Sequence, residues 1–484
     1  MADKEPNGAE FTLKVMVNKQ KTKVLFAEIE SDFADVLLSF LTLPLGKIVR
    51  VLKKHYADDQ LTRVNIGSLT TLYDGLSNLN NVCFWTDGCK EMLLDPRSSL
   101  EAECRKLKLD IHETQSTKYF LCENSKCSYS TAASVYRDTV KCSCGKTMKR
   151  EVDLKEFQSD SKNGVFTINA ASFLISDNLR MMPNVAVSIM QTLTNLGITD
   201  SVGAELMNVT FRFDEVMDLL KGSLLSQTPL TDIVFKKGKI ESATKKYETE
   251  TVLDPIEKEA DSNSKKMILK LMVQESTNKL LFAQAEEDFV DFLFSLLTIP
   301  LGGVLDCVLG SVNTITTGLK SIENLYKSVA TLIDDKYLVN PDAKTKLMKP
   351  KLIHGCMPKN QILPLNEESS QRLCYNRDVD LGKEWLSYSY YGRALCLKGQ
   401  RDYVKGPTMY MVSDDLTVAP LCMIASLSIM KEMKIPLSDV KEVEVQIGLH
   451  EALSILKASL TSTCALTDGL MIKPVSIKKP KREH

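Results

Sequence analysis

Two stretches of the chain begin with the same order of apolar and polar residues. In the first, Leu13–Val17 and Lys23–Glu28 are rich in apolar residues and are separated by a polar stretch, which predicts a β-hairpin. A helix is expected next, with Asp32 as its N-cap and Asp35 in its first turn, where carboxylates stabilise free amides and the helix dipole. Pro44 is expected to end it, because proline cannot continue a helix. Its apolar positions follow the spacing i, i+3, i+4, i+7, i+8 and are Phe33, Val36, Leu37, Phe40 and Leu41.

This pattern returns later in the chain. Leu13–Gly46 recurs at Leu269–Gly302 with a constant offset of 256 residues and no gap. Val209–Asp232 recurs at Val445–Asp468 with an offset of 236 residues. We infer an internal tandem duplication, in which the amphipathic stripes form the cores of two related units. Shorter matches between the copies are Gly67-Ser68 with Gly310-Ser311 and Gly75-Leu76 with Gly318-Leu319.

The back half of each copy predicts a strand that ends in a Ser-Asp turn, a helix, a second strand and a second helix. In the first copy these are Phe173–Asp177, Ala186–Leu196, Val209–Phe213 and Glu215–Leu225. In the second they are Tyr410–Asp414, Cys422–Met433, Val445–Leu449 and Glu451–Leu460. This order of hairpins, helices and strands predicts an α+β fold with partly antiparallel sheets.

The repeats divide the chain into two units and a linker. The predicted divisions are residues 10–238 for the first repeat unit, with a zinc-ribbon-like insertion at 116–152, 239–266 for a charged linker, 267–475 for the second repeat unit and 476–484 for a basic tail. The linker is charged and poor in large apolar residues. The two units are expected either to pack about a pseudo-two-fold axis or to stay separate along this linker.

Composition excludes several classes of protein. The 484 residues carry 61 Lys and Arg against 62 Asp and Glu, so no net field attracts nucleic acid or membrane. The most apolar runs are shorter than the roughly 20 residues of a membrane helix. The N-terminus lacks the apolar segment of a signal peptide, and the 13 cysteines are an odd number. We therefore expect an intracellular, cytoplasmic protein with reduced thiols or metal-bound cysteines.

Four cysteines in the first copy have the spacing of metal ligands. Cys122 and Cys127 form one pair, and Cys142 and Cys144 form a second pair that is followed by Gly145. Four thiolates from two local pairs suit structural Zn²⁺, with strand-like segments on both sides forming a ribbon-like hairpin. Gly145 is expected to turn the backbone so that amides point toward sulfur.

The sequence also allows other interpretations of these four cysteines. The cysteines could be unrelated reduced thiols or a redox-labile disulfide, or one of Cys83, Cys89 and Cys104 could replace a member of the quartet. A catalytic zinc is disfavoured because four thiolates leave no open coordination position. We expect metal removal to unfold Lys118–Val152 alone, because this polar segment has little apolar surface to bury.

The chain resembles a plant family called domain of unknown function 674. The resemblance rests on the repeated opening Leu13–Gly46 and Leu269–Gly302, on Cys89–Leu94 and on the turn Cys142–Gly145. It covers nearly the whole chain. It implies a plant protein, often duplicated, with no established activity, substrate or partner, and it contributes no catalytic residues.

Other signals in the sequence are weak. Strings typical of phosphate-binding loops, serine hydrolases and zinc proteases are missing, so we expect no enzyme. His450 and the acidic turns Ser176-Asp177 and Ser413-Asp414 are interpreted as structural. The segment around the cysteines is locally basic and is interpreted as a solvated surface. Its basic residues are Lys118, Lys126, Arg137, Lys141, Lys146, Lys149 and Arg150.

The sequence therefore favours a non-enzymatic intracellular interaction protein with structural zinc in its first repeat and unidentified protein partners. One alternative is a nucleic-acid-associated protein that uses the basic ribbon segment and the tail. The tail string Lys478–Arg482 also fits a nuclear-import signal, so entry into the nucleus is a second possible location. Another alternative is an enzyme of unfamiliar type with a cleft between the repeats.

Overall fold

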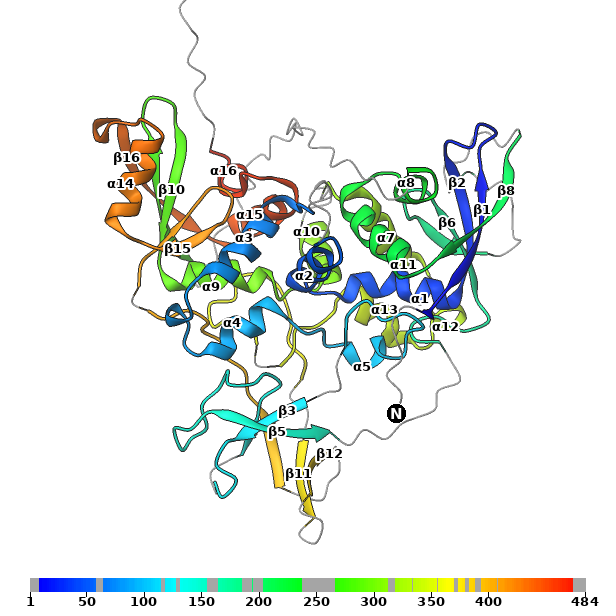
Figure 1. Ribbon diagram of the computed structural model, residues 1–484, viewed down its shortest axis with the longest axis horizontal. Helices are drawn as coiled ribbons and strands as arrows, with labels where there is room; N and C mark the ends of the chain where they lie inside the picture. Colours follow the sequence, from blue (N-terminus) through cyan, green and yellow to red (C-terminus); the bar gives the residue numbers. More distant parts are fainter. Residues whose placement is uncertain are drawn as a thin grey trace, which may run out of the picture.

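The protein contains three β-sheets with helices packed between them (Figure 1). The computed structural model describes residues 8–472 except 58–63, 115–117, 128–130, 155–163, 185–193, 195–202, 237–265, 312–317, 333, 355, 370–372, 379–382, 388–392 and 407. Most of the predicted linker, the predicted basic tail and most of the predicted helix Ala186–Leu196 lie outside the described residues. The mixture of helices and largely antiparallel sheets confirms the α+β class.

The first sheet has the strand order β7-β6-β2-β1-β8 and is antiparallel throughout. Its strands are β1 (Phe11–Val17), β2 (Val24–Glu30), β6 (Ser172–Ser176), β7 (Met181–Pro183) and β8 (Glu205–Phe211). The predicted hairpin is confirmed, since β1 pairs with β2. The face of the sheet that carries Leu13 and Val15 is buried, and Phe33 forms edge-to-face contacts with Phe11 and Phe211.

Below, the first half and the second half of the chain are the predicted repeat units 10–238 and 267–475. The helices of the first half lie between the sheets. They are α1 (Ser31–Ser39), α2 (Leu45–His55), α3 (Gly67–Asn78), α4 (Asp87–Leu94), α5 (Glu101–Cys104), α7 (Phe213–Leu225) and α8 (Pro229–Lys236), with short 3-10 turns at Phe40–Thr42 and Asn81–Cys83. The helical path breaks at Pro44, as predicted. The N-cap of α1 is Glu30, so the prediction of Asp32 as N-cap was wrong; Asp32 lies within the first turn.

The second sheet repeats this arrangement with the order β15-β14-β10-β9-β16. Its strands are β9 (Met267–Gln274), β10 (Lys279–Ala285), β14 (Tyr410–Val412), β15 (Val418–Pro420) and β16 (Val440–Ile447). The helices of this half are α9 (Glu287–Leu296), α10 (Leu301–Ser311), α11 (Lys320–Thr331), α12 (Asp334–Tyr337), α13 (Pro341–Met348), α14 (Met423–Glu432), α15 (Leu449–Thr461) and α16 (Ala465–Gly469), with a 3-10 turn at Leu437–Asp439. Strands at matching sequence positions thus hold matching places in the two sheets.

The two halves meet at the repeated Pro-Leu-Gly motifs. Pro44 and Pro300 form an antiparallel bridge, in which the N–H of Leu45 donates to Ile299 and the N–H of Leu301 donates to Leu43. The contact is close: a Cβ on Gly302 would lie 3.1 Å from the backbone oxygen of Leu41 in the first half, and a Cβ on Gly46 would lie 3.1 Å from that of Leu297 in the second. The halves therefore pack against each other rather than sitting as separate units along a linker.

Helices cross between the halves in a reciprocal way. Helix α3 of the first half packs on α15 of the second, and the hydroxyl of Ser68 donates to the carbonyl of Ser462 at 2.7 Å. Helix α11 of the second half packs on α7 of the first, and Ser321 donates to Ser226 at 2.7 Å. Ser68 and Ser321 therefore hold equivalent positions in the two halves, since each donates to a carbonyl at the end of a helix of the other half. The proposed match of Gly67 with Gly310 was wrong, because Gly310 lies near the end of the preceding helix α10.

A third sheet contains strands from both halves and is called the shared barrel below. Its order is β3-β5-β12-β11-β13-β4, and the bridge between Phe120 and Ser134 closes the ring. Its strands are β3 (Lys118–Cys122), β4 (Ala132–Ala133) and β5 (Met148–Leu154) from the first half, and β11 (Leu373–Asp378), β12 (Lys383–Ser387) and β13 (Arg393–Leu397) from the second. The two junctions between the halves, β5 with β12 and β4 with β13, are both parallel.

The interior of the shared barrel is apolar and comes from all six strands. Its buried side chains are Tyr119, Leu121, Ala133, Val135, Val152, Leu373, Leu386, Leu395 and Leu397. The predicted ribbon segment is therefore not an independent hairpin, because its strands share a core with the second half. In the part of the chain that the structure describes, no helix is long and apolar enough to cross a membrane.

Candidate metal centre

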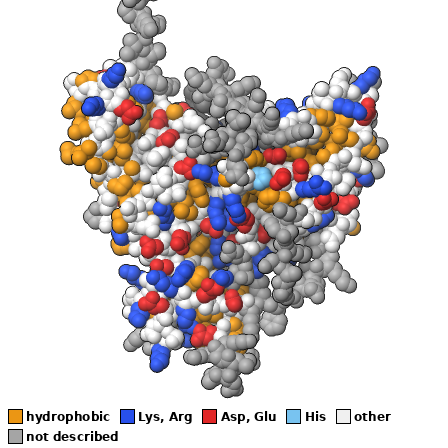
Figure 2. Space-filling view, viewed as in Figure 1, with side chains coloured by type: hydrophobic (Ala, Val, Ile, Leu, Met, Phe, Trp, Pro, Cys, Tyr) orange, Lys and Arg blue, Asp and Glu red, His pale blue; other side chains and the backbone are white. Residues whose placement is uncertain are grey.

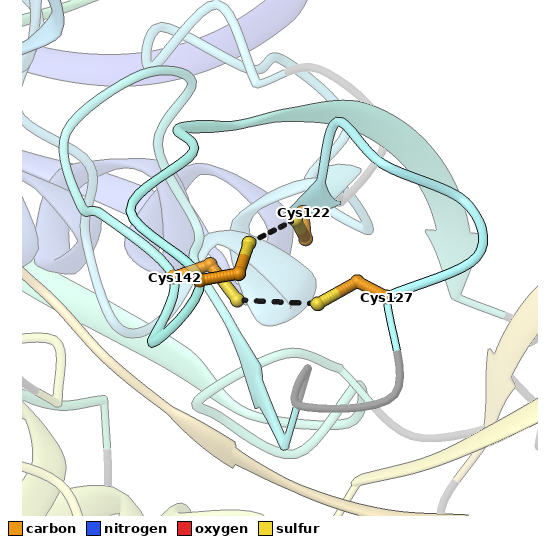
Figure 3. Close-up of side chains that lie close together, drawn as sticks. Cys122, Cys127 and Cys142 are labelled. Carbon is orange, nitrogen blue, oxygen red and sulfur yellow. Dashed lines mark hydrogen bonds between the residues drawn. The ribbon is translucent and has the colours of Figure 1, made fainter.

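Two loops at one end of the shared barrel bring four thiols together. Cys122 is the last residue of β3, and Cys127 lies in the loop that follows it. Cys142 and Cys144 lie in the turn that precedes β5. Strands β3 and β5 pair antiparallel with Cys122 opposite Met148, which places the two loops side by side (Figure 3). The structure thus groups the four cysteines that the sequence predicts as ligands.

The separations between these sulfur atoms suit a shared ion. The Sγ of Cys122 lies 3.5 Å from that of Cys144, and the Sγ of Cys127 lies 3.8 Å from that of Cys142. All four sulfurs lie within 4.8 Å of one another, and the labelled side chains point into one space (Figure 3). A disulfide has an S–S length of about 2.05 Å, so these are four separate thiols. Together they can hold a metal ion.

Backbone amides point at the sulfurs, as the glycine in the sequence predicts. Gly145 adopts a φ of +83°, and the following N–H of Lys146 donates to the sulfur of Cys144. This bond is the main reason that the pKa of the Cys144 thiol falls to about 7, while burial raises the pKa of Cys142. In the loop after β3, the N–H of Asn124 donates to the sulfur of Cys122. Amides in these places stabilise thiolates bound to a metal.

A small apolar cluster packs around the cysteines and fixes the positions of their thiols. Its buried members are Phe120, Cys122, Ala132, Val140, Cys142 and Met148, with Cys127 packed against them. The neighbouring cysteines of the sequence have other surroundings. Cys89 lies 3.2 Å from the hydroxyl of Thr86, and Cys104 lies 3.6 Å from that of Thr42. Among the described residues, neither belongs to the group of potential ligands.

Arg150 connects the metal centre with the second half of the chain, and sequence reasoning missed this role. Its Nε donates to the carbonyl of Cys122 at 3.2 Å. Its Nη1 forms an ion pair with Glu384 on β12, and its guanidinium lies 5.8 Å from the ring centroid of Tyr375 on β11. The sequence held no signal for this contact, because Arg150 and Glu384 are separated by 234 residues.

The basic residues of this segment divide into paired and exposed groups. Lys118 forms an ion pair with Glu151 at 2.7 Å, and Lys149 forms one with Asp138 at 3.2 Å. The exposed lysines of the two ligand loops are Lys126, Lys141 and Lys146. Arg137 lines a cavity between the barrel and helices α2 and α4. Five of these seven basic residues, Arg137 and Lys149 included, are exposed, while Lys118 and Arg150 are half-buried.

Buried aspartates occupy matching positions in the two halves but have structural partners. Asp35 accepts hydrogen bonds from the backbone N–H groups of Val165, Phe166 and Thr167, so it anchors a distant loop rather than capping its own helix. Asp291 accepts from two backbone N–H groups of the corresponding loop in the second half. Burial raises the pKa of both carboxyls, that of Asp291 to about 8.

The acidic turns of the sequence are also structural. Asp177 accepts from the N–H and hydroxyl of Thr231, and Asp414 accepts in the same way from Thr467. Each turn thus fastens a short C-terminal helix to its own sheet. His450 is exposed and lies 3.8 Å from Glu451, its neighbour in the chain.

A buried contact between a histidine, a threonine and a cysteine resembles a catalytic arrangement only at first sight. The Nε2 of His112 lies 3.4 Å from the hydroxyl of Thr42, which in turn lies 3.6 Å from the sulfur of Cys104. Burial lowers the pKa of His112 to about 4 and raises that of the Cys104 thiol. A neutral imidazole beside a protonated, fully buried thiol provides neither a thiolate nucleophile nor access for a substrate.

Comparison with known proteins identifies a family but no activity. No curated protein and no solved structure matches the chain. The model of a family described as "Protein of unknown function (DUF674)" matches residues 7–450, which include the first half, most of the second half and all four clustered cysteines. The chain therefore belongs to the DUF674 family.

Proposed function

We propose that the protein is a non-enzymatic interaction protein in which structural Zn²⁺ clamps the barrel shared by its two halves. The carrying observation is the position of the four clustered thiols at the end of the β3–β5 hairpin, whose strands complete the shared barrel. Tetrahedral zinc with Zn–S bonds of about 2.3 Å places its sulfurs about 3.8 Å apart. Separations of 3.5 and 3.8 Å between the paired sulfurs agree with this geometry.

A structural rather than catalytic ion follows from the ligand set. Four thiolates fill a tetrahedral shell and leave no position for water or a substrate. The cavity of about 260 Å³ next to the barrel is lined by apolar and charged side chains, and some of the charged ones pair with each other. Lys47 lies 2.6 Å from Asp95, and Arg97 lies 2.6 Å from Glu101. The first pair joins α2 to the end of α4, and the second is a local pair at the start of α5, so these charges support a framework better than a reaction site.

Elemental analysis of the purified full-length chain tests the metal. About one zinc per chain is expected, and the double variant Cys142→Ser/Cys144→Ser should lose it. The matched control Cys422→Ser/Cys464→Ser changes two exposed thiols outside the cluster and should keep it. Zinc retained by the first variant, or a different metal in the unmodified chain, would contradict the proposal. Affinity purification from native tissue with mass spectrometry tests the partners, and enrichment of no protein would contradict the interaction role.

A second candidate function is contact with nucleic acid. The observation in its favour is the set of exposed lysines at the ligand loops, Lys126, Lys141 and Lys146. Binding through these residues should weaken steeply with added salt, because phosphate contacts release counterions. The ion pairs of Lys118, Lys149 and Arg150 reduce the available charge, so this function is the less favoured one.

We place the protein in the cytoplasm, with nuclear entry as the alternative that the tail string Lys478–Arg482 suggests. The tail lies outside the described residues. Microscopy of a fluorescent fusion, with and without residues 476–484, would distinguish the two locations.

A further inference from the structure

The two outer sheets each end in an edge strand at opposite rims of the molecule, β8 on one side and β16 on the other (Figure 1). Among the strands that the structure describes, β8 pairs only with β1, and β16 pairs only with β9. An edge strand carries one row of backbone N–H and C=O groups that can pair with another chain. Proteins usually block such pairing with charged side chains along the edge.

The two edges differ in this protection. β16 carries three exposed charges: Lys441, Glu442 and Glu444. At the positions of the two glutamates, β8 has Leu206 and Asn208, given the offset of 236 residues between the repeats. The Leu206 side chain is 62% exposed. The edge of β8 therefore lacks the charges that protect its counterpart.

The charges that β8 does have lie at its ends. Glu205 begins the strand and forms an ion pair with Lys21 at 2.8 Å, with about half of its side chain exposed. Arg212 follows the last residue of the strand and lies 2.6 Å from Glu10, with 62% of its side chain exposed. The strand thus starts with a negative side chain and ends next to a positive one.

We propose that β8 pairs with β8 of a second copy of this chain, antiparallel about a two-fold axis at Asn208. In this register Leu206 faces Thr210 of the second copy and Met207 faces Val209, so no like charges meet. Because the strands run antiparallel, Glu205 of each chain lies opposite Phe211 of the second copy, next to the oppositely charged Arg212. Asn208 meets its own copy at the axis, where two amide side chains can hydrogen-bond to each other.

The surface beside β8 also favours this partner. Leu206 lies opposite Met16 on β1, and Met16 lies opposite Phe26 on β2, which gives an apolar row of one exposed and two half-buried side chains on the face of the sheet opposite its core. Figure 2 shows hydrophobic side chains gathered over this sheet. A second copy of β8 extends the sheet beyond this row and covers the exposed Leu206. The same pairing on β16 would bring Glu444 against Glu444 of the second copy, and like charges directly opposite each other repel.

Sedimentation velocity of the full-length chain across a concentration series tests the proposal. The unmodified chain should be a dimer that dissociates on dilution. Leu206→Glu/Asn208→Glu, which copies the protection of β16 onto β8, should be monomeric over the same range. The matched control Lys441→Glu/Gln446→Glu adds two carboxylates to the other edge and should remain dimeric.

Circular dichroism and thermal unfolding establish that each variant is folded. If the double variant fails to fold, Asn208→Lys at this exposed position repeats the test with a single change, and it should also give a monomer because two lysines then meet at the axis. Hydrogen exchange at β8 should slow as the unmodified chain dimerises. An unmodified chain that is monomeric at every concentration, a dimer that survives the β8 variants, or a dimer lost in the β16 control would overturn the proposal.

Discussion

Removal of the metal should loosen strands in the second half of the chain, although every proposed ligand lies in the first half. The β3–β5 hairpin carries the four clustered cysteines and pairs with β12 through β5, while the neighbouring β4 pairs with β13. When the hairpin loses its clamp, the second-half strands lose the partners that close the shared barrel. This expectation replaces the sequence-based one, in which only Lys118–Val152 unfolds.

The expected size of this effect follows from the barrel core. The second half contributes four buried leucines to it: Leu373, Leu386, Leu395 and Leu397. Fully burying a leucine stabilises by about 1.5–3 kcal/mol, so the four contribute about 6–12 kcal/mol to the docking of β11, β12 and β13. Loss of about 6 kcal/mol corresponds to amide exchange that is faster by about four orders of magnitude, because 1.4 kcal/mol is a factor of ten.

The assay is hydrogen exchange with mass spectrometry on the full-length chain, before and after incubation with a chelator. Peptides covering residues 118–154 and 373–397 should lose protection together, while peptides from β1, β2, β9 and β10 should keep theirs. The Cys142→Ser/Cys144→Ser variant should show the same pattern without chelator. Loss of protection confined to residues 118–154 would refute the reasoning, since it would mean that the second-half strands hold their positions without the hairpin.

Three further predictions concern the cores and the link between the halves. Phe40→Ala and Leu296→Ala each remove a fully buried side chain and should lower the free energy of unfolding in urea by about 2–5 kcal/mol; losses below 1 kcal/mol would contradict equivalent cores. Burial raises the pKa of Asp291 to about 8, so its contribution to stability is fully present below about pH 4 and is lost as the pH rises to about 8. Asp291→Asn, which can accept the same two N–H bonds, should therefore gain stability over the unmodified chain between pH 5 and 8, and a constant difference in urea titrations would count against this assignment. Arg150→Met should cost about 1–3 kcal/mol, and a double-mutant cycle with Glu384→Gln should give a coupling of about 0.5–3 kcal/mol, whereas additive effects would show that the ion pair does not connect the halves.

Local patterns in the sequence determined the elements and the candidate ligands. The β1–β2 hairpin and the last residues of β8 follow from a residue spacing of two, and the helix break at Pro44 follows from proline itself; both signals act within one element. The cysteine group was predictable for the same reason, because its two pairs are local and a single hairpin brings them together. Gly145 was predictable as well, since a tight turn with positive φ favours glycine.

Tertiary structure alone decided how the halves combine. The pairing of Pro44 with Pro300 and the ion pair of Arg150 with Glu384 join residues more than 200 positions apart, and the sequence pattern of a single element does not show that such residues meet. Asp35 was expected to serve its own helix, but burial placed it beside the backbone amides of a distant loop, where its carboxylate accepts their hydrogen bonds. Apolar surfaces must find cover somewhere, and a sequence shows which residues need it without showing which distant segment supplies it. In this chain each half covers part of the other, and the strands next to the clustered cysteines complete a barrel to which both halves contribute.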